Sequence, residues 1–184
     1  MTGAPDVASA PSVRLSRGTD AEAVAEIYNQ GIAERGATFE TAPRTAADLR
    51  ARIEQAPDRF PVIVAEDAGS VVGWASIGSY RERPCYAGVG EFSVYIHRDA
   101  RGRGVGRALL ARLVAEARAR GYWKLLSRVF PANTASLGLC RALGFREVGT
   151  YEKHGRLDGR WLDVVIVERL IPENLAGDAG TPTR

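Results

Sequence analysis

The stretch from Gly90 to Gly121 constrains the fold of this chain more than any other part of it. Its first part alternates apolar and polar residues with the period of a β-strand: Phe92, Val94 and Ile96 against Ser93, Tyr95 and His97. The last part repeats apolar residues at spacings of three and four, which is typical of a helix: Leu109, Leu110, Leu113, Val114 and Ala117. The stretch therefore predicts a strand, a glycine-bearing turn over residues 101–106, and a helix that ends at Gly121.

The turn Arg101-Gly102-Arg103-Gly104-Val105-Gly106 predicts an anion-binding site. At the start of a helix, backbone N–H groups and the positive end of the helix dipole point to one place. Gly104 and Gly106 lack Cβ atoms, so an anionic ligand can lie against the main chain. Arginines at 98, 101, 103 and 107 add positive charge. The glycines fit neither GxxxxGK[ST] nor GxGxxG, and a glycine-rich turn in an ordinary α/β protein remains the alternative.

Length, composition and charge narrow the class of protein. A chain of 184 residues that is 45% hydrophobic predicts one domain with a full core. It has no apolar run of the ~18 residues that a membrane helix needs and no recognisable secretory signal, so we expect a cytoplasmic protein that binds no membrane. A net charge of +3 with dispersed arginines argues against a nucleic-acid partner. Two cysteines and two histidines argue against a metal site.

The remaining segments predict an α/β (α+β) fold in the order β-α-α-β-β-β-α-β-α-β-β. Strand–helix–strand units favour parallel pairing and hairpins favour antiparallel pairing, so we expect a mixed, mostly antiparallel central sheet flanked by helices. Residues 19–22 and 45–48 each have the pattern of a capping box at a helix start. We expect residues 1–12 to be a disordered lead, 13–171 the domain and 172–184 a flexible tail.

Three motifs together resemble the GNAT family of N-acetyltransferases: the glycine turn after the strand SVYI, and the downstream segments NTAS and ALGF. The resemblance covers about residues 13–170 and implies the GNAT fold with acetyl-coenzyme A as co-substrate and no metal. It implies that the donor contacts the main chain of the strand, the turn, and the start of the helix after NTAS. The residues are Val94, Tyr95, Ile96, Arg101, Gly102, Arg103, Gly104, Val105, Gly106, Asn133 and Ser136. Capping alone would also explain Asn133, and we expect a bulge near Ser93 to free the strand's amides.

Two catalytic roles follow from the resemblance. Glu91 opens the strand before the turn, where related enzymes carry a glutamate that acts as general base. The alternative is a half-exposed strand glutamate in a surface ion pair. The backbone N–H of Val94 is expected to stabilise the oxyanion. Cys140 stands where many members have a tyrosine that protonates the leaving thiolate; a thiol could do this, and packing in the core is the alternative.

The loop over residues 80–86 predicts the site of the acceptor. Tyr80, Arg81, Arg83 and Tyr86 suit an acidic group, because guanidinium groups bind carboxylates and phosphinates through two parallel hydrogen bonds. A solvated loop is the alternative. Phe39 is expected either to line the substrate pocket or subunit contact, or to cover the core. The resemblance implies that Thr41 is a wall residue of the same site. His154 and Asp158 lie in the last predicted hairpin, and we interpret them as turn residues rather than as site residues.

The ending GRWLDVVIVERL resembles one branch of the family, the phosphinothricin, methionine sulfone and arsinothricin acetyltransferases. This branch implies acetylation of the α-amino group of a small glutamate-like amino acid, resistance by detoxification, and a homodimer. Two other hypotheses stay open. One is a GNAT enzyme that acts on a protein N-terminus or a polyamine, and the other is a non-catalytic acetyl-coenzyme A sensor.

Overall fold

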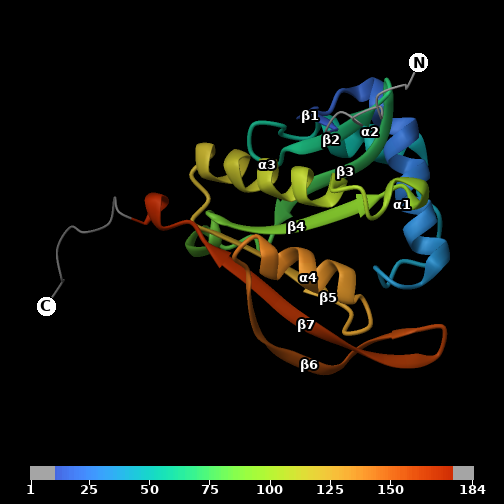
Figure 1. Cartoon of the computed structure of the whole chain (residues 1–184). Coiled ribbons are helices and arrows are strands. Elements are labelled where there is room, and N and C mark those ends of the chain that lie inside the picture. The colour runs from blue at the N-terminus through green and yellow to red at the C-terminus, as the bar shows by residue number, and fades with distance from the viewer. Residues whose placement is uncertain (1–10, 176–184) are drawn as a thin grey trace, which may run out of the picture.

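The computed structural model describes residues 11–175 of the chain (Figure 1). Most of the expected lead and most of the expected tail lie outside the described residues. The first strand begins at Ser12, one residue before the predicted domain boundary. At the other end, Pro172–Asn174 forms a short 3-10 turn.

The elements follow the predicted order of strands and helices. In chain order they are β1 (Ser12–Leu15), α1 (Ala21–Glu34), α2 (Ala46–Glu54), β2 (Val62–Asp67), β3 (Ser70–Ser79), β4 (Val89–Ile96), α3 (Val105–Ala119), β5 (Lys124–Val129), α4 (Thr134–Ala142), β6 (Arg146–Leu157) and β7 (Arg160–Leu170). The strand–turn–helix unit predicted for residues 90–121 is β4, the glycine turn and α3.

The strands form one sheet in the order β1-β2-β3-β4-β5-β7-β6. Within the described residues, β4 and β5 are the parallel pair, and every other neighbouring pair is antiparallel. The prediction of a mixed, mostly antiparallel sheet flanked by helices is confirmed.

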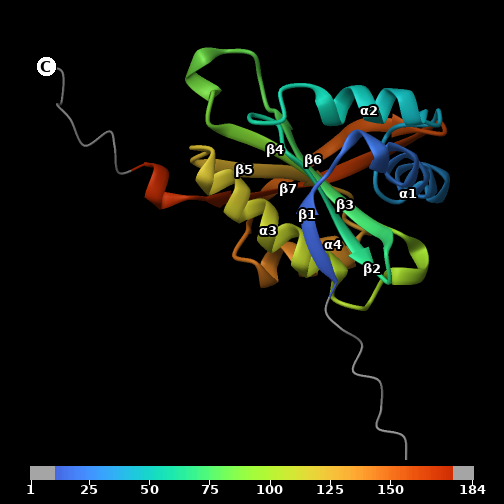
Figure 2. The ribbon, with the colours of Figure 1, turned by 90° about the horizontal axis from the view of Figure 1, so that it is seen from above.

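Helices cover both faces of the sheet, as the view from above shows (Figure 2). On one face, α1 and α2 bury Val24, Ile27 and Leu49 against Trp74 of β3. On the other face, α3 buries its apolar stripe with α4: Leu109, Leu110, Leu113 and Ala117 of α3 are fully buried. Burial of these stripes, rather than the intrinsic stability of the helices, fixes the two layers.

Strands β4 and β5 separate along their length. They pair only from Val89 to Glu91, opposite Lys124 to Leu126. Beyond Glu91, β4 continues beside β3 as far as Ile96, while β5 continues beside β7. A gap therefore opens in the middle of the sheet, next to the second half of β4.

The gap exposes main-chain groups without the predicted bulge. The β3–β4 register is continuous from Gly73 opposite Ile96 to Ser79 opposite Gly90, so the expected bulge near Ser93 is wrong. The N–H of His97 donates to the Val72 carbonyl on β3. Because alternate residues of an antiparallel ladder face the same neighbour, the N–H groups of Val94 and Ile96 face away from β3, into the gap. Strand separation thus does what the bulge was expected to do.

Candidate active site

Two adjoining pockets occupy the gap between β4 and β5. The larger, about 730 Å³, lies beside the glycine turn and the start of α4. The smaller, about 530 Å³, lies between β4, β5 and the segment after α1. Six residues line both pockets: Ala37, Val94, Tyr95, Asn133, Ser136 and Leu139. The second half of β4 therefore forms a wall common to the two.

The glycine turn has the backbone geometry that its sequence predicts. Gly102 and Gly104 have φ angles of 74° and 82°, which L-residues with a Cβ rarely adopt. Gly104 caps α3 and accepts the first helical hydrogen bond, from the N–H of Ala108. A Cβ on Gly106 would lie 3.2 Å from Cδ2 of Leu139, so a glycine here lets α3 and α4 approach closely. The amides at the start of α3 consequently open into the larger pocket.

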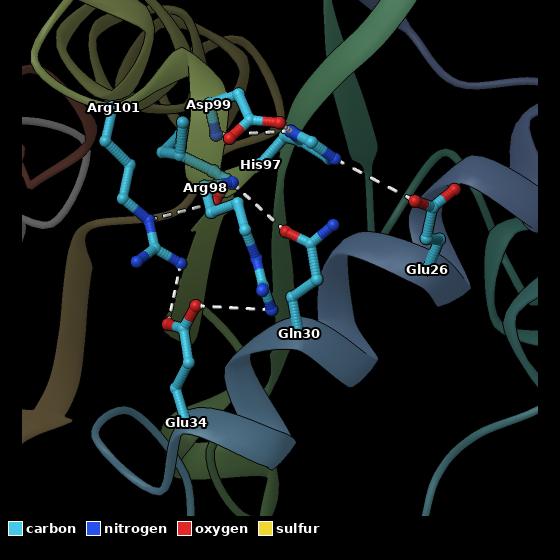
Figure 3. Close-up of polar contacts among 8 residues, drawn as sticks. Glu26, Gln30, Glu34, His97, Arg98, Asp99 and Arg101 are labelled. Atoms are coloured by element: carbon cyan, nitrogen blue, oxygen red, sulfur yellow. Dashed lines mark hydrogen bonds and ion pairs between the residues drawn. The ribbon is translucent and has the colours of Figure 1, made fainter.

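A glutamate of α1 holds two arginines, Arg98 before the turn and Arg101 at its first position (Figure 3). Nη2 of Arg101 lies 2.8 Å from Glu34, and its Nε donates to the carbonyl of Ile96 at 3.3 Å. Arg98 lies 3.6 Å from the same carboxylate, and its N–H donates to the side chain of Gln30. These contacts tie the end of β4 to α1. Arg101 also lines the larger pocket, so its role in donor binding stays a prediction.

Arg103 of the turn and Arg107 of α3 differ in their ion-pair partners and in their position relative to the larger pocket. Arg103 pairs with Asp67 at 2.5 Å and does not line the larger pocket. Arg107 lines that pocket, and within residues 11–175 it has no carboxylate partner. The cationic group that is free for an anionic ligand is therefore Arg107, which the sequence analysis counted only as part of a cluster.

The wall formed by β4 packs against an aromatic cluster. Tyr95 stacks on Trp74 with ring centroids 4.9 Å apart and meets Tyr28 edge-on at 4.8 Å. Burial raises the pKa of Tyr95 well above its usual value. Val94, Tyr95 and Ile96 line the larger pocket. Strand-like contacts of their main chain with a ligand stay a prediction.

Asn133 and Ser136 line both pockets at the start of α4. Oδ1 of Asn133 accepts from the N–H of Ser136 at 3.1 Å, which confirms the capping interpretation. Its Nδ2 donates to the carbonyl of Gly36 at 3.3 Å and links α4 to the segment after α1. A role for either residue in ligand binding stays a prediction.

Glu91 lines the smaller pocket and faces a partner that the sequence analysis did not name. Its carboxylate forms two parallel contacts with Arg128 of β5, each 3.0 Å long. The Glu91 side chain is 28% exposed, and that of Arg128 is 39% exposed. Glu91 is thus a half-buried, ion-paired carboxylate that is open to the pocket, which satisfies the ion-pair alternative and leaves the catalytic role as a prediction.

Aromatic residues form the far wall of the smaller pocket. Phe39 lines it and meets Phe130 edge-on, with ring centroids 4.8 Å apart. His154, interpreted from the sequence as a turn residue, lies in β6 and also lines the pocket. Thr41 does not line either pocket. Asp158 has a φ of 46° in the β6–β7 turn, as expected of a turn residue.

The loop expected to bind the acceptor lies apart from both pockets. Tyr80 and Tyr86 meet edge-on at 5.5 Å, and the guanidinium of Arg81 lies 5.3 Å from the ring centre of Tyr80. Neither these residues nor Arg83 line the pockets. Their role in substrate binding stays a prediction that the pocket geometry does not require.

Cys140 packs in the main core at 2% exposure and borders the smaller pocket. Burial raises the pKa of its thiol to about 11. The thiol therefore stays protonated at neutral pH, and its contacts fit the packing interpretation.

Sequence reasoning missed Arg128, Tyr28 and Thr38, all of which line the smaller pocket. A signal existed for Arg128: it interrupts the apolar strand segment YWKLLSRVF, and a charge in such a strand needs a partner.

Within residues 11–175, no group of three or more His, Cys, Asp or Glu could hold a metal ion. Over the same residues, no helix is long and apolar enough to cross a membrane.

Comparisons with known proteins show that this chain is similar to acetyltransferases. A model of the acetyltransferase (GNAT) family matches residues 24–145. Phosphinothricin N-acetyltransferase of Alcaligenes faecalis is 39% identical over 173 residues, which cover 93% of this chain and 86% of the relative. An L-methionine sulfoximine/L-methionine sulfone acetyltransferase of Pseudomonas paraeruginosa is 35% identical over 159 residues, or 85% of this chain and 92% of the relative.

A solved structure has the same fold. The phosphinothricin acetyltransferase of Sinorhizobium meliloti in complex with acetyl-coenzyme A superposes with a TM-score of 0.84 at 33% identity, covering 94% of this chain and 93% of that one. The chain therefore belongs to the acetyltransferase (GNAT) family. It is an N-acetyltransferase, and its acetyl donor is acetyl-coenzyme A. The larger pocket fits this donor, because it combines free helix amides, the exposed edge of β4 and the cation of Arg107.

Proposed function

We propose that this enzyme acetylates the α-amino group of a small glutamate-like amino acid of the phosphinothricin or methionine sulfone type, and thereby detoxifies it. The observation that carries the proposal is the position of Glu91 in the smaller pocket, next to the wall that this pocket shares with the larger one. Similarity to the Alcaligenes and Pseudomonas enzymes supports this class of acceptor. Arsinothricin, a third acceptor of this kind, enters the proposal through the sequence of the C-terminal segment.

The chemistry needs an unprotonated amine, and Glu91 is the group we assign to remove its proton. The N–H of Val94 faces the gap and lines both pockets, so we assign it to the oxyanion that forms on the acetyl carbonyl. The smaller pocket, about 530 Å³ with an aromatic wall, suits a small amino acid better than a long polyamine. As the tetrahedral intermediate collapses, the bond from the acetyl carbon to sulfur breaks and coenzyme A leaves as a thiolate. The nitrogen loses a second proton as the amide forms, which balances the proton that the thiolate takes up.

The direct test is to follow thiol release with acetyl-coenzyme A and a panel of acceptors. The panel holds phosphinothricin, L-methionine sulfone, arsinothricin, a short peptide with a free N-terminus, and a polyamine. We expect turnover with at least one of the first three. Turnover confined to the peptide or the polyamine would replace the proposal, and donor binding without turnover on any amine would support the sensor hypothesis.

Glu91→Gln tests the assignment of the base. We expect kcat to fall about 10²-fold or more, as loss of a general base does, while the affinity for acetyl-coenzyme A stays the same. Rapid kinetics at saturating donor measures the first quantity and calorimetry the second. A kcat within a factor of about 2 of the parent enzyme, where base loss predicts about 10², would show that Glu91 serves only its ion pair.

We also infer that two copies of the chain associate, since related enzymes of the branch imply a dimer and β6 is an open edge of the sheet. A cytoplasmic location stays a prediction from the sequence.

A further inference from the structure

The acetyl-transfer reaction assigns a role to Glu91 but none to Arg128, the residue with which Glu91 forms an ion pair in the smaller pocket. Both nitrogen–oxygen contacts measure 3.0 Å, with one Nη on each carboxylate oxygen. Both side chains line the pocket, and both keep part of their surface exposed. The pair is therefore reachable by a bound acceptor.

Arg128 is also the cation best placed for an anionic acceptor. Among the described residues that line the smaller pocket, it is the one arginine, and no lysine accompanies it. Glu40, which also lines the pocket, is paired with Arg44 at 2.6 Å. The loop arginines 81 and 83 lie outside the lining.

A free amino acid carries the same two charges side by side, an α-ammonium and an α-carboxylate. We infer that Arg128 binds the α-carboxylate of the acceptor, and that the acceptor inserts into the Glu91–Arg128 pair with its ammonium on Glu91. The one original ion pair, with its two nitrogen–oxygen contacts, is then replaced by two ion pairs: the ammonium with Glu91, and Arg128 with the α-carboxylate in the same two-point geometry. The proton of the ammonium passes to Glu91, which no longer shares its oxygens with Arg128.

The exchange sets the specificity of the enzyme, and it rests on the proposed function in assuming a free amino acid as acceptor. An amine without an α-carboxylate offers nothing to Arg128, so it must break the ion pair and leave the guanidinium without a partner. Free amino acids are therefore preferred over amino-acid amides, peptides and polyamines.

Binding experiments test the inference without turnover. Coenzyme A, which has no acetyl group to transfer, is bound first, and calorimetry then measures Kd for L-methionine sulfone and for its α-carboxamide. For the unaltered enzyme we expect the free acid to bind about tenfold tighter or more, a ratio that corresponds to one charged hydrogen-bonded contact.

Three variants separate the roles of the two residues. In Arg128→Gln we expect the acid-over-amide ratio to fall close to one, and in Arg128→Lys to an intermediate value, since lysine keeps the charge without the two-point geometry. In Glu91→Gln we expect the preference for the acid to remain. Arg118→Gln is the matched control, because Arg118 forms an exposed ion pair with Glu173 on a different part of the surface, and its ratio should equal that of the parent enzyme.

Equal affinities for acid and amide in the parent enzyme, binding of neither, or an unchanged ratio in Arg128→Gln would each overturn the inference. Circular dichroism and thermal unfolding confirm that the variants fold. Product formation from the same acceptors with acetyl-coenzyme A is measured in parallel. A free acid that binds through Arg128 and is not acetylated would refute the proposed function while leaving the carboxylate site in place.

Discussion

Gly155 of β6 lies directly against the ring of Phe39. A Cβ built on Gly155 would lie 2.7 Å from Cε1 of Phe39. Real Cβ atoms essentially never lie within 3.0 Å of another heavy atom in this way, so the ring would have to move. Phe39 lines the smaller pocket and contacts Phe130. A single methyl group outside the pocket can therefore reshape its aromatic wall.

We expect Gly155→Ala to raise the KM for the acceptor about tenfold, because overpacking at this contact costs about 1–3 kcal/mol and is relieved by moving Phe39. The KM for acetyl-coenzyme A should not change, since Phe39 does not line the larger pocket. Gly149→Ala in the same strand is the control, because an added Cβ there has nothing within 4 Å. Equal acceptor KM values in the two variants would remove Phe39 from the acceptor site.

Of the two capping boxes predicted at helix starts, one forms and the other does not. Thr45 caps α2: its Oγ1 accepts from the N–H of Asp48 at 3.1 Å, and Asp48 accepts from the N–H of Thr45 at 2.9 Å. The helix start predicted at residues 19–22 is confirmed, since α1 begins at Ala21, but the capping box predicted there does not form. There a 3-10 turn over Gly18–Asp20 precedes α1, and Asp20 provides no side-chain cap to it.

Asp20 instead joins β1 to the start of α1. Its carboxylate accepts from Arg14 at 2.8 and 2.9 Å and from the N–H of Arg17 at 2.7 Å, and it is 8% exposed. The hydrogen bonds from Arg14 outweigh burial and hold the pKa of Asp20 below its ordinary value. The folded state therefore binds this proton less tightly than the unfolded state does.

The stability that Asp20 contributes is accordingly complete above its unfolded pKa of about 3.9 and is lost as pH falls through its lower folded pKa. We expect Asp20→Asn to reduce the free energy of unfolding by about 1–3 kcal/mol at pH 7, with the difference from the parent enzyme shrinking below about pH 4. Urea unfolding at several pH values measures it. Asp58→Asn, at an exposed position, is the control, and a difference that grows toward acid pH would contradict the assignment.

In the whole molecule, strand β6 forms one edge of the sheet and has no neighbouring strand on its outer side among the described residues. The β6–β7 hairpin borders the molecule (Figure 1) and exposes large apolar residues: Val148 at 49%, Tyr151 at 54% and Trp161 at 56%. A long edge strand with such residues pairs readily with another chain. The dimer that we infer would bury this edge in each copy.

We expect sedimentation equilibrium to give a mass of twice 19.8 kDa for the parent enzyme. The double variant Val148→Lys, Tyr151→Lys should give a single chain, because charged residues on an edge strand oppose pairing. Leu15→Lys places one such charge on an exposed leucine of β1, at the opposite edge, and should leave the mass doubled. A parent enzyme that sediments as one chain would refute the dimer.

From the order of residues alone it was possible to predict the order of the elements, the mixed sheet and the glycine turn. These depend on local physics: the period of apolar residues sets strand or helix, and positive φ angles at Gly102 and Gly104 need no distant contact. The family resemblance added the donor and the type of reaction.

Which charged side chains are free to bind a ligand depends on the packing of segments that are distant in the chain. Arg101 pairs with Glu34, which is 67 residues away in the chain, and Arg128 pairs with Glu91 over a separation of 37. No periodicity encodes such partners, because they depend on how β4 and β5 separate and on which face α1 covers. For the same reason the pocket formed around Arg128 on β5, whereas the arginine-rich loop that looked suited to the acceptor lies outside it.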